Sequence, residues 1–136
     1  MTSHTEPFAE AVNLELARAK RYRVFVSMIS LDLGGARTTD GAYDWDTLIL
    51  DVRANVRTTD CVALLHDSKL VLLMPETPRQ GAEQAARRIS TLVQERFRGK
   101  TDKLFHVPLE MASYPDAAGT QTVAQMLQEL VKSGAN

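Results

Sequence analysis

The chain has 136 residues, of which 44% are hydrophobic and 24% are charged. This length and balance predict one folded globular domain over residues 1–136, and they exclude a second catalytic or regulatory domain. Sixteen basic and seventeen acidic side chains give a net charge of -1, so no overall attraction to DNA or to anionic lipid follows. Any site for a polyanion must therefore be a local group of residues.

A single cysteine, Cys61, excludes an internal disulfide and a zinc site built from cysteines. The polar N-terminus lacks the basic and apolar regions of a secretory signal, and no apolar run reaches the roughly 20 residues that cross a bilayer. We therefore expect a cytoplasmic protein that does not insert into membranes and does not bind DNA.

The first half of the chain predicts two helices on either side of a strand. A helix from about Phe8 to Arg23 is rich in Ala, Leu and Glu. Val24 to Leu33 is almost continuously apolar, which predicts a strand covered on both faces. After a loop, a helical stripe resumes at Trp45. The apolar residues of this stripe are Trp45, Leu48, Val52 and Val56.

A basic cluster ends the first predicted helix. Its charge complements the negative end of the helix dipole, so a solvated helix face is the simpler interpretation, although the cluster could also hold a phosphate. The cluster consists of Arg18, Lys20, Arg21 and Arg23.

The second half predicts a hairpin, a long helix, a strand and a short helix. Cys61 to Leu65 and Lys69 to Met74 are apolar runs joined by a short polar turn, which is typical of a β-hairpin. Cys61 would then be a small buried residue. Thr77 to Gln80 has the form of a capping box with proline at the first helical position. The remaining elements are expected from there to about Phe97, near Leu104 to Ser113, and from Val123 to Lys132.

The predicted order is therefore αβαββαβα. Such interleaving indicates the α/β (α+β) class, with one central sheet, mixed but mostly antiparallel, flanked by helices.

The segment from Arg57 to Pro75, RTTDCVALLHDSKLVLLMP, resembles the central segment of the GGDEF family, the bacterial diguanylate cyclases. In that family RxxDxxARYGGDEF precedes a short apolar strand and a proline, and these features fall in register here. ELARAKRYRVFVSMISLDL is similar to the family's first helix and strand, AARRI to its AERIR helix, and MASYP to its GVASYP strand. The resemblance covers almost the whole chain and implies a single degenerate GGDEF-like domain with the nucleotidyl-cyclase-like fold.

The family's signature is absent from this chain. His66-Asp67-Ser68-Lys69-Leu70 stands in its place, and Asp32 is the one family metal-binding carboxylate that is kept. Phosphoryl transfer from GTP needs carboxylates that hold two divalent cations, and a lysine would repel them. A one-residue slip that moved Asp67 into place would turn the apolar strand after Lys69 to the wrong face.

The stretch that would hold GTP, between Asp32 and Arg57, is also shorter than in active members. The resemblance therefore implies no cyclase activity, with no metal and no cofactor. We interpret His66 as a surface turn residue, because neither a nucleophile nor a second metal ligand accompanies it.

Active members often carry an inhibitory site that binds their product through the Arg and Asp of RxxD and an Arg of the AERIR helix. These positions correspond to Arg57, Asp60 and Arg88 here. A guanidinium can donate to guanine O6 and N7 or to phosphate, and a carboxylate can accept from guanine N1–H and its amino group. The resemblance thus implies cyclic di-GMP as the ligand. Alternatively, Arg57 and Asp60 form only a local ion pair or a turn cap.

Two functions follow from these alternatives. The first is an inactive receptor that binds cyclic di-GMP and signals through an unidentified effector protein, with a homodimer promoted by the ligand as one mechanism. The second is a pseudo-enzyme that binds no nucleotide and serves as an interaction or dimerisation module.

Overall fold

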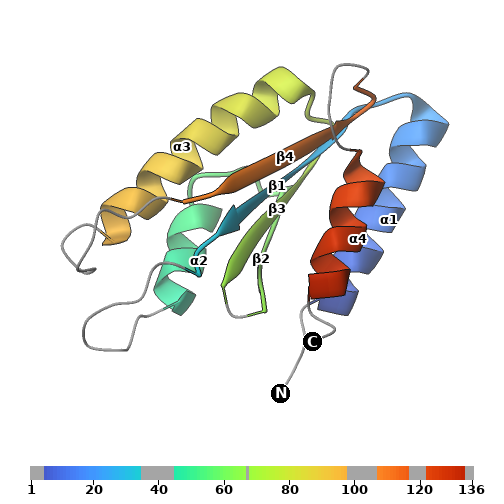
Figure 1. Ribbon diagram of the computed structural model, residues 1–136. Coiled ribbons are helices and arrows are strands. Elements are labelled where there is room, and N and C mark those ends of the chain that lie inside the picture. The colour runs from blue at the N-terminus through green and yellow to red at the C-terminus, as the bar shows by residue number, and fades with distance from the viewer. Residues whose placement is uncertain (1–4, 35–44, 67, 98–106, 117–121, 134–136) are drawn as a thin grey trace.

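The computed structural model describes residues 5–34, 45–66, 68–97, 107–116 and 122–133, which form four helices and four strands in the predicted order (Figure 1). The elements are α1 (Thr5–Tyr22), β1 (Val26–Asp32), α2 (Trp45–Arg53), β2 (Cys61–Leu65), β3 (Lys69–Pro75), α3 (Arg79–Phe97), β4 (Leu109–Tyr114) and α4 (Val123–Ser133). None of the helices within the described ranges is long and apolar enough to cross a membrane.

The four strands form one sheet in the order β2-β3-β1-β4. All three neighbouring pairs are antiparallel, so the expectation of a mixed sheet was wrong in this detail. The strands β1 and β2 do run in the same direction, as a crossover through α2 requires, but β3 lies between them and separates the parallel pair. The prediction that β1 is covered on both faces is confirmed, because its first six residues are all buried.

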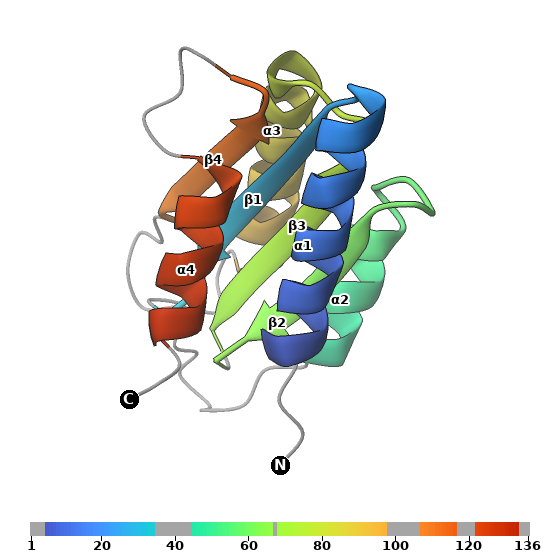
Figure 2. The same cartoon turned by 90° about the vertical axis from the view of Figure 1, so that its right-hand side faces the viewer.

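Helices cover both faces of the sheet. Figures 1 and 2 show α2 and α3 on one face and α1 and α4 on the other. Side chains alternate along each strand, so β1 contributes Ile29 and Leu31 to the core under α2 and α3, and Val26 and Met28 to the core under α1 and α4. The sheet is therefore the middle layer of three, with an apolar core on each side.

The end of α1 differs slightly from its predicted position. The helix begins at Thr5 and ends at Tyr22, and the Val24 amide then donates to the Ala19 carbonyl at 3.2 Å. Between them, Arg23 has a φ of 56°, in the left-handed region. This is the geometry of a Schellman C-cap, in which the left-handed position is usually glycine.

The start of α3 also differs from the prediction. The Thr77 hydroxyl donates to the Pro75 carbonyl at 3.0 Å, and the Pro78 carbonyl accepts from the Ala82 amide at 3.0 Å. The Thr77 hydroxyl thus bonds within the β3–α3 turn and does not form the predicted capping box. A capping box does occur at α4, where Thr122 and Gln125 exchange bonds of 2.9 and 3.1 Å between side chain and amide.

The last strand is shorter than predicted. Val107 and Pro108 precede β4, which begins at Leu109, and residues 104–106 lie outside the described residues. Proline has no N–H to donate to a ladder, although the Pro108 carbonyl accepts from the Asp32 amide at 2.9 Å. The predicted final helix is confirmed within one residue, since α4 ends at Ser133.

Candidate ligand-binding site

The turn between α2 and β2 brings Arg57 and Asp60 together. Arg57 Nη2 lies 3.2 Å from Asp60 Oδ1, and the Arg57 amide donates to Asp60 Oδ2 at 3.0 Å. The Asp60 amide returns a bond of 3.0 Å to the Arg57 carbonyl. The Asp60 side chain is only 4% exposed, whereas that of Arg57 is 53% exposed. The RxxD motif therefore forms a closed turn with a shielded carboxylate and a guanidinium that faces solvent.

Arg57 also joins this turn to the β3–α3 connection. Its Nη2 donates to the Pro75 carbonyl at 2.6 Å and to the Thr77 hydroxyl. Thr77 is buried, and its carbonyl accepts a bond of 2.7 Å from the Ser27 hydroxyl of β1. The Arg57 guanidinium is thus held between two turns on a rigid base.

Arg88 lies on α3 and reaches the same corner of the molecule. Its Nε and Nη2 donate to the Asn55 carbonyl, at 3.3 and 3.2 Å. Asn55 follows α2 and precedes Arg57 by two residues. Within the described part of the chain, Arg88 bonds neither Arg57 nor Asp60. Two of the three predicted ligand residues, Arg57 and Asp60, therefore bond each other directly. The third, Arg88, bonds the backbone just before them.

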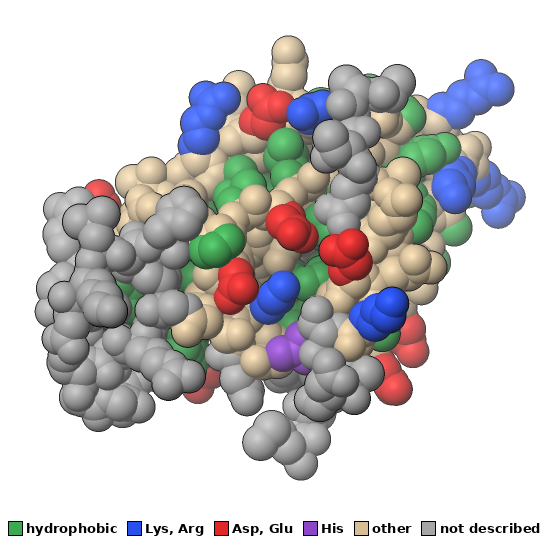
Figure 3. Space-filling view, in the orientation of Figure 1, with side chains coloured by type: hydrophobic (Ala, Val, Ile, Leu, Met, Phe, Trp, Pro, Cys, Tyr) green, Lys and Arg blue, Asp and Glu red, His purple; other side chains and the backbone are tan. Residues whose placement is uncertain are grey.

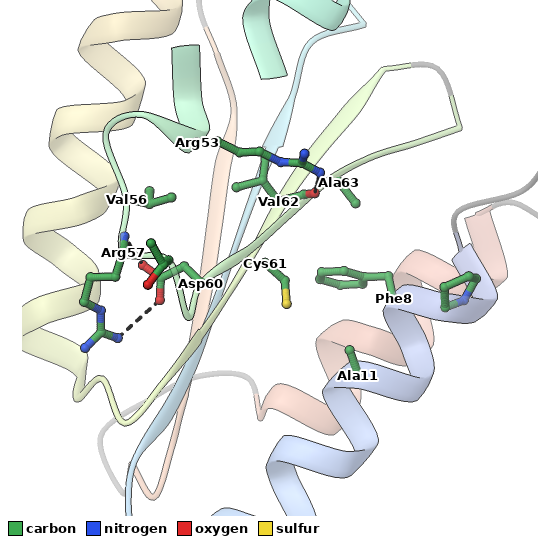
Figure 4. Close-up of a pocket in the computed structure, with 11 residues that line it drawn as sticks. Phe8, Ala11, Arg53, Val56, Arg57, Asp60, Cys61, Val62 and Ala63 are labelled. Carbon is green, nitrogen blue, oxygen red and sulfur yellow. Dashed lines mark hydrogen bonds and ion pairs between the residues drawn. The ribbon is translucent and has the colours of Figure 1, made fainter. Parts of the chain in front are cut away.

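A groove of about 590 Å³ borders this corner, between α1 and the edge strand β2. Figure 4 shows Phe8 and Ala11 of α1 facing Cys61 and Ala63 across it, with Arg57 and Asp60 at one end. The groove is lined by Pro7, Phe8, Ala11, Arg53, Val56, Arg57, Thr58, Asp60, Cys61, Val62 and Ala63.

Cys61 is exposed on this groove, so the prediction that it is buried was wrong. The reason is its place on β2, an edge strand, at the strand's first residue. Part of the thiol is nonetheless shielded from water, and this shielding is the main reason why the pKa of Cys61 is raised. The carboxylates of Glu15 and Asp60 raise the pKa further, whereas the Arg53 guanidinium lowers it.

The described residues from His66 to Leu70, which stand where the resemblance puts the family's signature, lie at the opposite end of the sheet from Arg57. Asp32 and Lys69 are direct cross-strand partners on β1 and β3, and Asp32 Oδ1 accepts a bond of 2.8 Å from the Gly34 amide. The Leu33 amide donates to the Ser68 carbonyl at 2.7 Å, and Leu70 is fully buried. Lys69 pairs with Leu65 across the hairpin, so the register is the expected one, without a slip. The side chain of Asp67 lies outside the described residues.

Among the described residues, no group of three His, Cys, Asp or Glu side chains could hold a metal ion. Lys69 is the cross-strand partner of Asp32 in the register, where cation binding would need further carboxylates.

His66 has a partner that the sequence did not reveal. Its backbone is left-handed, with a φ of 54°, and its Nε2 lies 2.8 Å from the Leu130 carbonyl of α4. A carbonyl only accepts, so this nitrogen carries the proton. His66 is an exposed turn residue, as predicted, but it also links the hairpin to α4.

Other parts of the corner were also missed by sequence reasoning. The Thr77-Pro78 pair is typical of a helix cap, and this pattern does not indicate that the Thr77 hydroxyl binds Arg57. Asn55 gives no side-chain signal, because Arg88 binds its backbone carbonyl. Phe8 follows the apolar pattern of α1, but that pattern does not indicate which strand it faces.

No protein-family model and no curated protein matches the chain. Solved structures do match in fold. The GGDEF domain of PA1120 (YfiN or TpbB) from Pseudomonas aeruginosa has a TM-score of 0.64 and 18% identity, over 94% of this chain and 84% of that one. The active GGEEF domain of a diguanylate cyclase from Vibrio cholerae has a TM-score of 0.61 and 17% identity, over 90% and 81%.

A third structure is the GGDEF domain of DgcB from Caulobacter crescentus in complex with c-di-GMP, with a TM-score of 0.61, 13% identity and coverage of 96% and 79%. At these identities the similarity establishes the fold alone. The chain therefore has the α+β fold of the GGDEF domains of diguanylate cyclases.

Proposed function

We propose that this protein is a catalytically inactive, GGDEF-like receptor that binds cyclic di-GMP through Arg57, Asp60 and Arg88 and signals through an effector protein. The observation that carries the proposal is the α2–β2 corner, where a shielded carboxylate orients a half-exposed guanidinium and an exposed arginine from α3 reaches the same turn. Guanine edges and phosphates both suit such a set of donors and acceptors.

The bonding pattern of the arginines supports this proposal. Among the described residues, the bonds made by the Arg57 guanidinium all leave from Nη2, so Nε and Nη1 remain for a ligand. Arg88 uses Nε and Nη2, which leaves Nη1. A planar ligand edge can therefore bind without breaking the turn. The similarity in fold to a domain solved in complex with c-di-GMP supports the same class of ligand.

We further propose that the protein has no diguanylate cyclase activity. The cross-strand neighbours Asp32 and Lys69 support this, because an ammonium at that position opposes the binding of the two cations that the reaction needs. Incubation with GTP and Mg²⁺, followed by chromatography of the nucleotides, should yield no cyclic di-GMP. Formation of product that scales with protein concentration would contradict this part of the proposal.

Thermal denaturation tests ligand binding and separates it from effects on stability. Cyclic di-GMP at about 100 times its dissociation constant should stabilise the wild-type protein by about 2.7 kcal/mol. Arg57→Ala and Arg88→Ala should reduce the increase in melting temperature. Arg87→Ala removes another exposed arginine, from the neighbouring position on α3, and should keep the full increase.

One observation favours the alternative, an interaction module that binds no nucleotide. Asp60 is nearly buried and both of its carboxylate oxygens already bond Arg57, as in a turn cap. On that account Arg57→Ala would lower the melting temperature, and cyclic di-GMP would not shift the melting temperature of any variant.

Dimerisation promoted by the ligand is a separate part of the proposal. A ligand with two guanines can bridge two copies of the domain. Light scattering should report a larger mass with cyclic di-GMP than without it, and Arg88→Ala should suppress the increase.

A further inference from the structure

The end of α1 carries a second cluster of charge, away from the Arg57 corner. We call it the basic corner and define it by Lys20, Arg21, Tyr22, Arg23 and Phe25. Figure 3 shows Lys and Arg side chains gathered at the upper right of the molecule, over the end of α1 seen in Figure 1.

The cations of the basic corner have no carboxylate partner within the part of the chain that the structure describes. Among the described residues, Lys20, Arg21 and Arg23 form no salt bridge, whereas the nearby Arg18 pairs with Glu15 at 3.6 Å and Glu76 at 3.5 Å. Lys20 and Arg21 lie instead over aromatic rings. Three positive charges within four residues are therefore available to an anionic partner, in a chain whose net charge is -1.

Two aromatic side chains stand exposed among these charges. Tyr22 is 60% exposed and Phe25 is 43% exposed. Arg21 Cζ lies 5.5 Å from the centre of the Tyr22 ring, and Lys20 Nζ lies 5.7 Å from that of Tyr114. These contacts keep the cations beside the rings, because a ring face attracts a cation.

The backbone at Arg23 adds an independent observation. Arg23 occupies the left-handed position of the C-cap, with a φ of 56°, where glycine would carry no steric cost. A charged residue is therefore held there at the expense of stability, which is a pattern associated with functional sites.

We propose that the basic corner docks the protein on an anionic lipid bilayer as a peripheral contact without insertion. Arginine and lysine are attracted by the negative surface potential of such bilayers, and exposed aromatic rings favour the interface. A long nucleic acid fits less well, because it needs a basic path over several nucleotides and this chain is acidic overall. A bilayer needs contact with a single corner.

Co-sedimentation of the whole chain with vesicles tests this proposal. More protein should pellet with vesicles that contain phosphatidylglycerol than with pure phosphatidylcholine, and added salt should reduce the difference. The double variant Arg21→Glu, Arg23→Glu should abolish the difference. A matched double variant, Arg87→Glu with Lys132→Glu, makes the same change in net charge elsewhere on the exposed surface and should retain it.

The variant Arg23→Gly separates binding from folding. It should partition onto the anionic vesicles about fivefold more weakly, because one cation is lost, and yet melt at a higher temperature, because the backbone strain is relieved. Equal losses in both double variants, or equal pelleting with the two kinds of vesicle, would overturn the proposal. Binding of a labelled single-stranded RNA by the basic corner, with no preference for anionic vesicles, would overturn it in favour of a nucleic acid.

Discussion

Asp60 is the residue on which the α2–β2 corner depends most. Its carboxylate accepts from the amide and the guanidinium of Arg57, and its side chain is 4% exposed. A shielded carboxylate that bonds a backbone amide stabilises a turn more than an exposed ion pair does. These bonds need no ligand, so the corner is already formed by the chain itself and Arg57 is held in place.

Replacing Asp60 tests this role. Asp60→Ala should lower the free energy of unfolding by about 1–3 kcal/mol, because the Arg57 amide loses its acceptor in a shielded turn. Urea denaturation measures the change. Glu10→Ala, at an exposed position of α1, is the control and should stay within about 0.5 kcal/mol of wild type. Similar changes in both variants would mean that Asp60 does not organise the turn.

Cys61 gives a chemical probe of the same corner, because it is the one cysteine of the sequence. Partial burial and the carboxylates of Glu15 and Asp60 raise the pKa of its thiol, so less thiolate is present near neutral pH than for a free cysteine. Alkylation by iodoacetamide should therefore be slower for the folded protein than for the unfolded protein at the same pH. Glu15→Gln should speed the folded reaction, and an unchanged rate would argue against the electrostatic cause.

At the scale of elements, local patterns predicted most of the structure. The apolar runs of β1 and β3 and the stripes of the helices are set by burial on this sheet, so their type and order could be predicted. The predictions were wrong where a residue distant in the sequence determines how an element begins. Thr77 caps no helix because Arg57 and Pro75 bind its hydroxyl, and β4 starts late because Pro108 cannot donate to β1.

The central strands should carry much of the stability. Leu72 of β3 is fully buried under α2 and α3, so Leu72→Ala should lower the free energy of unfolding by about 2–5 kcal/mol. Leu50 of α2 is 64% exposed, and Leu50→Ala should change the free energy of unfolding by less than about 1 kcal/mol. Chemical denaturation of both variants checks the comparison. A larger loss at Leu50 would indicate that a partner or a second copy covers α2.

At the scale of the whole molecule, the two ends of the sheet carry different sets of charged residues. One end carries the cross-strand pair Asp32 and Lys69, and the other end carries Arg57 and Asp60. The local pair could be predicted from the RxxD spacing. The bond from Arg57 to Thr77 and the bond from Arg88 to Asn55 could not be predicted. They join segments that come together only because α3 packs on the sheet.

A calorimetric titration of the unmodified chain with cyclic di-GMP, repeated with Arg57→Ala, tests the central claim most directly. The wild-type protein should give a saturable heat of binding. Arg57→Ala removes the guanidinium whose Nε and Nη1 are proposed to bind the ligand, so binding should weaken by about 2–5 kcal/mol, or at least about thirtyfold. Absence of binding heat from the wild-type protein, or equal affinity of the two proteins, would contradict a receptor site at Arg57, Asp60 and Arg88.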